Sequence, residues 1–304
     1  MLFSSPKNRF SKYLKKYPNT KIIVVAGSYG RTSAINALGN ILGQNFTVSV
    51  GLNYQEPCDI VILPYDPLSN FSDITPDFTV VTAIHEDAEA DKFFALANRS
   101  RHVFVNMEDI PKKYSNRINN QNTITYGVDL TGYRGTLVSP DGTTIPDLRI
   151  KLLGEHNLRP VVMSIGIAHM FKLPVSKIID GVNAITPLPG RLNPGLGING
   201  AIIIDDSADT SDLSMELSLR TIYSLPAPSR VFITGRISDH VRINRELISE
   251  VLVVSSKPIK SHDPLIKIFS NDLSLLQYLA TRLEPDGIVL LEYSLPSIIE
   301  KKLL

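Results

Sequence analysis

The chain has 304 residues, of which 43% are hydrophobic, and a formal net charge of +1. This length allows about two domains, and the near-neutral charge gives no electrostatic argument for binding nucleic acid or a membrane surface. No apolar run reaches about 18 residues, so the sequence predicts no transmembrane segment. The single cysteine, Cys58, excludes an internal disulfide and a cysteine-based zinc site and agrees with a cytoplasmic protein.

The first residues are basic but lack the apolar core of a signal peptide. Phe10, Tyr13 and Leu14 recur at helical spacing, which predicts a solvated helix that packs these side chains on the domain. A helix that lies on a membrane surface is the alternative.

The strongest signal lies between Lys21 and Leu42. An apolar, β-branched run over Ile22–Val25 predicts a buried parallel strand. A glycine-containing loop over residues 27–33 follows, and then a helical pattern with one apolar face. Strand, loop and helix N-terminus in this order predict a phosphate cradle, because backbone N–H groups and the helix dipole favour an anion there.

The loop departs from the strict phosphate-loop pattern, G-x-x-x-x-G-K-[ST]. Gly27 and Gly30 permit a positive φ and a close backbone approach, and Thr32 or Ser33 would supply a hydroxyl to Mg²⁺. The first glycine of the pattern is missing, and Arg31 replaces the lysine. An ordinary strand–turn–helix connection of an α/β fold therefore remains the alternative.

Strands and helices alternate after this helix, which indicates a parallel sheet with right-handed crossovers. Strands are expected at residues 47–50, 59–63, 78–84 and 102–106, with a helix over 88–97. His85, Glu86 and Asp87 follow the third strand at its carboxyl end, where open α/β sheets bind ligands. They form either a polar loop that caps the helix or part of a metal or catalytic site.

Between residues 122 and 153 the pattern changes to short alternating runs around an Asp141-Gly142 turn, which predicts an antiparallel unit. The helices expected next span residues 155–171 and 175–184. Proline and glycine cluster between Thr186 and Gly200 and mark a domain boundary. We expect a first domain over residues 1–190 and a second over residues 191–304.

The second domain also reads as α/β. Its strands are expected at residues 201–204, 231–234, 251–254, 266–269 and 288–291. Its helices are expected from Ser211 or Asp212 to about Tyr223, over residues 272–283 and over residues 295–303. The sequence thus predicts an α/β protein with a parallel-sheet, P-loop-type central domain that carries a small antiparallel subsheet. A smaller, Rossmann-like α/β domain would follow it.

With these landmarks in order, the chain resembles the Mur ligase family, and most closely the branch that adds D-alanyl-D-alanine in peptidoglycan synthesis. Residues 27–33 (GSYGRTS) resemble G-T-N-G-K-[TS]-[TS], and residues 153–157 (LGEHN) resemble the G-x-H-N helix start. Residues 188–191 (LPGR) are similar to the P-G-R interdomain segment. Residues 204–215 (IDDSADTSDLSM) are similar to I-D-D-T-Y-N-A-N-P-x-S-M. The likeness covers the family's central ATPase and C-terminal domains.

The resemblance implies ATP-dependent joining of a carboxylate to an amine through an acyl phosphate, with ATP and Mg²⁺ as cofactors. Both substrates are unidentified, and a protein partner is a further expectation. The residues implied to bind nucleotide are Gly27, Ser28, Gly30, Arg31, Thr32, Ser33, His156, Asn157, Arg191 and Asp206. Metal contacts are implied for Thr32, Asp66 and Glu86, and catalytic roles for Arg31, His85 and Asp87.

Departures from the family pattern fall on the chemistry. Leu63-Pro64-Tyr65 stands where the family has a metal-binding glutamate, and Ala88 stands at the position of a metal-binding histidine. The family's V-K-G-S-R reads Leu291-Glu292-Tyr293-Ser294-Leu295, which loses both cations. With about twenty residues before the first strand, a UDP-sugar domain is not expected.

Two alternatives therefore stand beside the ligase. One is a catalytically degenerate relative that binds a nucleotide or acts as a scaffold or regulatory protein. The other is a folylpolyglutamate-synthase-like ligase, which also lacks the UDP-sugar domain. Some candidate residues also have plain structural roles, since His156 can cap its helix and Asp205-Asp206 can be a solvated strand end.

Overall fold

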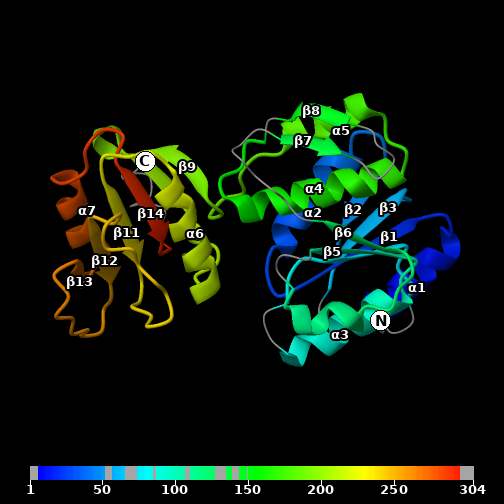
Figure 1. The fold of residues 1–304 in the computed structure, drawn as a ribbon, viewed down its shortest axis with the longest axis horizontal. Coiled ribbons are helices and arrows are strands. Elements are labelled where there is room, and N and C mark those ends of the chain that lie inside the picture. Colours follow the sequence, from blue (N-terminus) through cyan, green and yellow to red (C-terminus); the bar gives the residue numbers. More distant parts are fainter. Residues whose placement is uncertain are drawn as a thin grey trace, which may run out of the picture. The chain divides into compact units, whose positions relative to one another are not determined.

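The computed structural model describes residues 6–51, 57–65, 74–84, 87–106, 110–126, 135–138, 144–148 and 150–294. The chain divides into two compact units (Figure 1). The first unit comprises Met1–Lys151 and Glu155–Thr186, and the second comprises Leu152–Gly154 and Pro187–Leu304. Among the described residues, no helix combines the length and the apolar character that crossing a membrane requires.

A six-stranded sheet in the order β2-β3-β1-β4-β5-β6 forms the centre of the first unit. Its strands are β1 (Lys21–Ala26), β2 (Val48–Val50), β3 (Ile60–Pro64), β4 (Phe78–Val81), β5 (His102–Asn106) and β6 (Thr123–Tyr126). All five pairings are parallel. The central strands are buried on both faces, which explains why they read in the sequence as continuous apolar runs.

Helices cover both faces of this sheet (Figure 1). On one face lie α2 (Arg31–Leu42), α4 (Glu155–Met170) and α5 (Val175–Ala184). On the other lie α1 (Pro6–Lys16) and α3 (Asp87–Arg99), with the short helix η1 (Lys112–Arg117) after β5. Phe10 and Tyr13 of α1 are 1% and 9% exposed and belong to the core that α3 also fills. The expectation that α1 packs these side chains on the domain is confirmed.

The antiparallel unit is smaller than the sequence predicted. The prediction is wrong for β6, which pairs in parallel with β5 and extends the main sheet. The described antiparallel pair consists of β7 (Gly135–Val138) and β8 (Thr144–Leu148). Alternating polarity identifies a strand exposed on one face, and an edge strand of a parallel sheet shows the same pattern. The Asp141-Gly142 turn lies outside the described residues.

The second unit has its own six-stranded sheet in the order β13-β12-β11-β14-β10-β9. Its strands are β9 (Asn193–Leu196), β10 (Ile202–Asp205), β11 (Arg230–Thr234), β12 (Glu250–Val254), β13 (Ile266–Phe269) and β14 (Ile288–Glu292). Five are parallel, and β9 runs antiparallel along the edge of β10. The sequence did not predict β9, because Pro194 and Gly195 disfavour a strand except at such an edge.

Two helices pack on opposite faces of the second sheet. One is α6 (Asp212–Ser224), whose side chains join the core around Ile204 and Phe232. It begins where expected, because the Ser211 hydroxyl accepts the Ser214 N–H as an N-cap. The other is α7 (Asp272–Ala280), which packs on the core around Ile203 and Leu252 and ends three residues before the predicted Leu283. The short helix η2 (Ile198–Gly200) precedes β10, and the helix predicted over residues 295–303 lies outside the described residues.

Candidate phosphate-binding site

The turn from β1 to α2 leaves the start of the helix without a side-chain cap. Gly30 is the N-cap residue and has left-handed backbone angles, with φ 78° and ψ −2°. The first described backbone bond at this end of the helix runs from the Ala34 N–H to the Gly30 carbonyl, at 3.0 Å. The N–H groups of Arg31, Thr32 and Ser33 precede it and point out of the helix end. Together with the helix dipole, they form the kind of site that binds an anion.

Gly27 fixes the path of this turn against the end of β4. Its φ is +143°, and a Cβ built there would lie 2.1 Å from Thr82 Oγ1 and 2.9 Å from the Ala83 nitrogen. Two hydrogen bonds hold the turn in place: the Ser28 N–H donates to the Ala83 carbonyl at 2.9 Å, and the Thr82 hydroxyl donates to the Tyr29 carbonyl. The backbone is therefore preorganised, as a phosphate cradle requires.

Arg31, which replaces the expected lysine, is anchored beside the turn. Its Nη1 donates to the Tyr65 carbonyl at 2.8 Å, just after β3 ends. Tyr65 is itself fixed, because its N–H donates to the Val25 carbonyl of β1 at 2.8 Å. The half-buried guanidinium thus lies across the carboxyl ends of β1 and β3. This bond uses one of several N–H donors, so the group keeps capacity for an anion.

The structure brings the start of α4 to the same helix end. The Ser33 hydroxyl donates to Asn157 Oδ1 at 3.2 Å, and Asn157 Nδ2 lies 3.3 Å from His156 Nε2. These two motifs, which lie far apart in the sequence, therefore meet at the start of α2.

Glu89 lies beside the phosphate turn, although no motif in the sequence pointed to it. Its Oε2 accepts the Ser28 hydroxyl at 3.0 Å, which places a carboxylate from the first turn of α3 next to the phosphate turn. The available signal was its position in the first turn of a helix that follows a central strand. Pairing with Ser28, 61 residues earlier, was not visible in any local pattern.

A metal ion would find few protein ligands among the described residues. They include no group of three or more His, Cys, Asp or Glu that could hold one. Asp66, His85 and Glu86 lie outside the described residues, as does the side chain of Asp87 at the start of α3. Mg²⁺ usually takes one or two carboxylates together with phosphates and water. The exposed Thr32 hydroxyl and the Glu89 carboxylate fit that limited role.

In the second unit, Asp205 and Asp206 bind the backbone of the proline- and glycine-rich segment between Thr186 and Gly200. Asp206 is 6% exposed and accepts the Leu192 N–H at 2.9 Å and the Ser218 hydroxyl. Asp205 accepts the Gly190 N–H at 3.0 Å. The Asp206 carboxylate is thus engaged within the unit. Burial raises its pKa, and the charge of the half-buried Arg191 only partly opposes that rise.

Glu292 faces Asp206 across neighbouring strands and is almost fully buried, at 1% exposed. Neither of its carboxyl oxygens has a hydrogen-bond partner among the described residues. Burial, and then the Asp206 charge, raises the pKa of Glu292 to about 10. Burial also raises the pKa of Asp206 to about 6, against the opposing bonds from Ser218 and Leu192. The pair therefore retains a proton at neutral pH.

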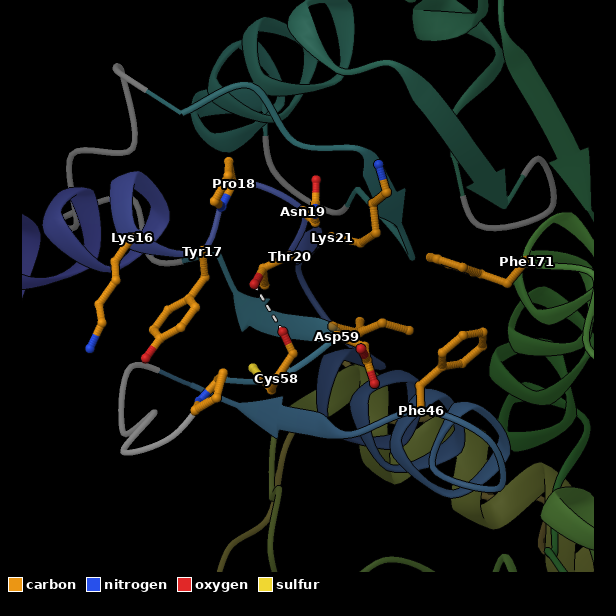
Figure 2. Close-up of a pocket in the computed structure, with 12 residues that line it drawn as sticks. Lys16, Tyr17, Pro18, Asn19, Thr20, Lys21, Phe46, Cys58, Asp59 and Phe171 are labelled. Atoms are coloured by element: carbon orange, nitrogen blue, oxygen red, sulfur yellow. Dashed lines mark hydrogen bonds between the residues drawn. The ribbon is translucent and has the colours of Figure 1, made fainter.

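A separate pocket of about 500 Å³ lies at the amino ends of the strands in the first unit (Figure 2). The ring centroids of Phe46 and Phe171 lie 5.5 Å apart on one side of it, and Tyr17 lies on the other. The Thr20 hydroxyl donates to the Cys58 carbonyl at 2.9 Å along its floor. The phosphate turn follows the carboxyl end of β1, so the two sites are distinct.

The fold and the turn define a two-unit α/β protein whose first unit is of the phosphate-loop type. No family model matches the sequence. Two of the curated relatives that match show how far the likeness extends, and the chain spans less than half of the length of each. They are the UDP-N-acetylmuramoyl-L-alanyl-D-glutamate–2,6-diaminopimelate ligase of Geobacter sulfurreducens and the UDP-N-acetylmuramate–L-alanine ligase of Chlorobaculum parvum. The first is 28% identical over 42% of this chain and 24% of its own length, and the second is 26% identical over 61% and 47%.

Solved structures extend the likeness to the whole chain. The MurF ligase from Thermotoga maritima in complex with ADP superposes with a TM-score of 0.76 and 18% identity, covering 99% of this chain and 83% of that one. The Mycobacterium tuberculosis folylpolyglutamate synthase complexed with ADP and AMPPCP gives a TM-score of 0.68 and 13% identity, covering 94% and 92%. The chain is thus similar in sequence to Mur ligases over part of its length, and it shares the fold of solved MurF ligase and folylpolyglutamate synthase structures.

Proposed function

We propose that the chain is an ATP-dependent ligase that joins a carboxylate to an amine through an acyl phosphate. The observation that carries this proposal is the uncapped start of α2 behind the Gly27–Gly30 turn, with Arg31 fixed beside it. Solved relatives with ADP or AMPPCP support it, since they share this fold. A cell-wall role agrees with the curated relatives.

In this proposal the chain's own residues position the nucleotide. The N–H groups of Arg31, Thr32 and Ser33 bind its terminal phosphates, and the guanidinium of Arg31 neutralises their charge. The residues proposed near the adenine are His156 and Asn157, and those proposed for metal or catalytic contacts are Thr32, Asp66, His85, Glu86 and Asp87. With ATP and Mg²⁺ held there, the substrate carboxylate would attack the γ-phosphoryl group and ADP would leave, and the amine would then displace phosphate from the acyl phosphate.

Arg31→Ala is expected to weaken nucleotide binding at least tenfold. A ligand at about 100 times its Kd stabilises the folded protein by about 2.7 kcal/mol, and a tenfold weaker ligand by about 1.4 kcal/mol. The measurement is the thermal shift of the full chain with ATP and Mg²⁺. Arg101→Ala is the matched control, because this exposed arginine pairs with Asp77 at 3.3 Å at the amino end of β5.

Two results would contradict the proposal. The absence of any shift with wild-type protein at millimolar ATP would exclude the nucleotide site. An unchanged shift in Arg31→Ala would show that the turn is not where the nucleotide binds. Binding without ADP release, across a panel of carboxylates and amines, would favour the catalytically degenerate alternative.

A further inference from the structure

We propose that Glu89 is a ligand of the divalent cation that accompanies the nucleotide, an inference that rests on the proposed function. Glu89 lies in the first turn of α3, and its Oε2 lies 3.0 Å from Ser28 Oγ in the phosphate turn. The departures from the family pattern remove the expected glutamate after β3 and the expected histidine at Ala88. Glu89 supplies a carboxylate next to the phosphate turn.

Charge balance is the first argument. A half-buried carboxylate next to a turn that receives phosphates would repel them unless a cation lies between the two anions. Among the described residues, no lysine or arginine forms an ion pair with Glu89. Within the described part of the chain, the charge of this carboxylate is therefore not paired directly with a basic side chain. A divalent cation shared with the phosphates offsets it.

Coordination chemistry is the second argument. The Ser28 hydroxyl occupies one lone pair of Oε2, and an ionised carboxylate has about four acceptor sites. The remaining sites suffice for a cation. Mg²⁺ seeks such a limited protein contribution, since phosphates and water complete its octahedral shell. The bond from Ser28 fixes the orientation of the carboxylate, as outer-shell hydrogen bonds do for metal ligands.

The test compares Glu89→Gln with wild type in calorimetric titrations of ADP, with Mg²⁺ and with EDTA. Glutamine keeps the size and an acceptor for Ser28 but removes the charge. We expect Glu89→Gln to lower the affinity for ADP with Mg²⁺ about 10- to 100-fold. Its affinity in EDTA should be unchanged or higher, because the repulsion is gone. Electron paramagnetic resonance with Mn²⁺ and ADP should show the matching loss of bound cation.

Two further variants separate this role from plain alternatives. Asp91→Asn removes a charge from the same helix at a 69% exposed site that pairs with Arg117, and it should behave like wild type. Ser28→Ala removes the hydrogen bond but keeps the carboxylate, so it should lose less Mg²⁺-dependent affinity than Glu89→Gln. If Ser28→Ala and Glu89→Gln lose the same Mg²⁺-dependent affinity, Glu89 only holds the turn, and the proposal is overturned.

Other outcomes are equally decisive. If wild type binds ADP and Glu89→Gln binds it as well or better in both conditions, Glu89 is not a cation ligand, whereas the nucleotide site stands. If wild type binds no nucleotide in either condition, the proposed function fails, and this inference fails with it.

Discussion

Glu292→Gln is expected to stabilise the second unit at pH 8 and to remove most of the pH dependence of its stability. The buried Glu292 carboxyl keeps its proton in the folded chain, because burial and the Asp206 charge raise its pKa. Above the pKa that Glu292 has in the unfolded chain, the carboxyl must take up a proton from solvent when the chain folds, which costs free energy. Glutamine has nearly the same shape, can donate its amide hydrogens toward Asp206, and needs no proton.

The sign of the effect follows from the two raised pKa values. The folded pair binds more protons than the unfolded chain above about pH 4, so stability falls as the pH rises. Asp206 contributes to this fall in stability up to its folded pKa of about 6, and Glu292 contributes to it up to about pH 10. Uptake of one proton on folding changes the free energy of unfolding by about 1.4 kcal/mol per pH unit. Glu292 therefore lowers the free energy of unfolding by up to about 4 kcal/mol between pH 5 and pH 8.

The measurement is hydrogen exchange of the β10 and β14 amides in the full chain between pH 5 and pH 9, corrected for intrinsic exchange. Glu250→Gln is the matched control on the same sheet. Burial disfavours the charge of Glu250, but bonds from Lys267 and Tyr278 outweigh it, and its pKa is lowered. Stability from Glu250 is therefore present at pH 8 and lost as the pH falls through its folded pKa. The proposal is contradicted if the Glu292→Gln protein is less stable than wild type at pH 8 and its stability changes with pH as steeply as in wild type. Both carboxyl groups of the pair would then be ionised.

Gly27→Ala is expected to destabilise the first unit by about 2–6 kcal/mol and to abolish nucleotide binding. The added methyl group would overlap Thr82 Oγ1, at 2.1 Å, and would press on the Ala83 nitrogen, at 2.9 Å. Overpacking of this kind costs about 1–3 kcal/mol, and a side chain at a φ of +143° adds about 1–3 kcal/mol of backbone strain. Relief of the clash would move the turn away from β4 and disorganise the N–H groups of the cradle.

Gly39→Ala is the control for this experiment. Gly39 lies inside α2, twelve residues after Gly27, and a Cβ there would meet nothing within 4 Å. Alanine favours a helix interior by about 1 kcal/mol over glycine, so this variant should be slightly more stable and bind ATP normally. The measurements are hydrogen exchange of the β1 and β4 amides and the ATP-dependent thermal shift. Normal ATP binding by Gly27→Ala would refute the assigned role of the turn.

The sequence predicted the sheets well where the strands are buried on both faces. Such strands read as unbroken apolar runs, as in β1 and β14, and helices such as α5 begin and end where expected. Prediction failed for two of the four edge strands, β6 and β9, whereas the edge strands β2 and β13 lie close to where they were expected. At an edge, pairing is decided by which neighbour is available, and side-chain pattern carries little of that information.

The candidate site could also be predicted only in part from the sequence. The phosphate turn was predictable, because its glycines and the adjoining strand and helix are contiguous in sequence. Glu89 and the Asp206–Glu292 pair were not predictable, since each depends on contacts between distant segments. In the sequence, Glu292 stands where the family pattern has a lysine, and the structure adds that this acid is buried next to another acid.

The two units are less separable than a division at one residue suggests. The chain passes between them after Lys151, after Gly154 and after Thr186. Leu153 packs against the core that contains Leu192 and Ile204, although it lies before α4 in the sequence. Asp205 and Asp206 also bind the backbone of Gly190 and Leu192. Severing the gene at one point therefore leaves one fragment missing a piece of its interior, and transplanting the second unit requires grafting residues 152–154 as well.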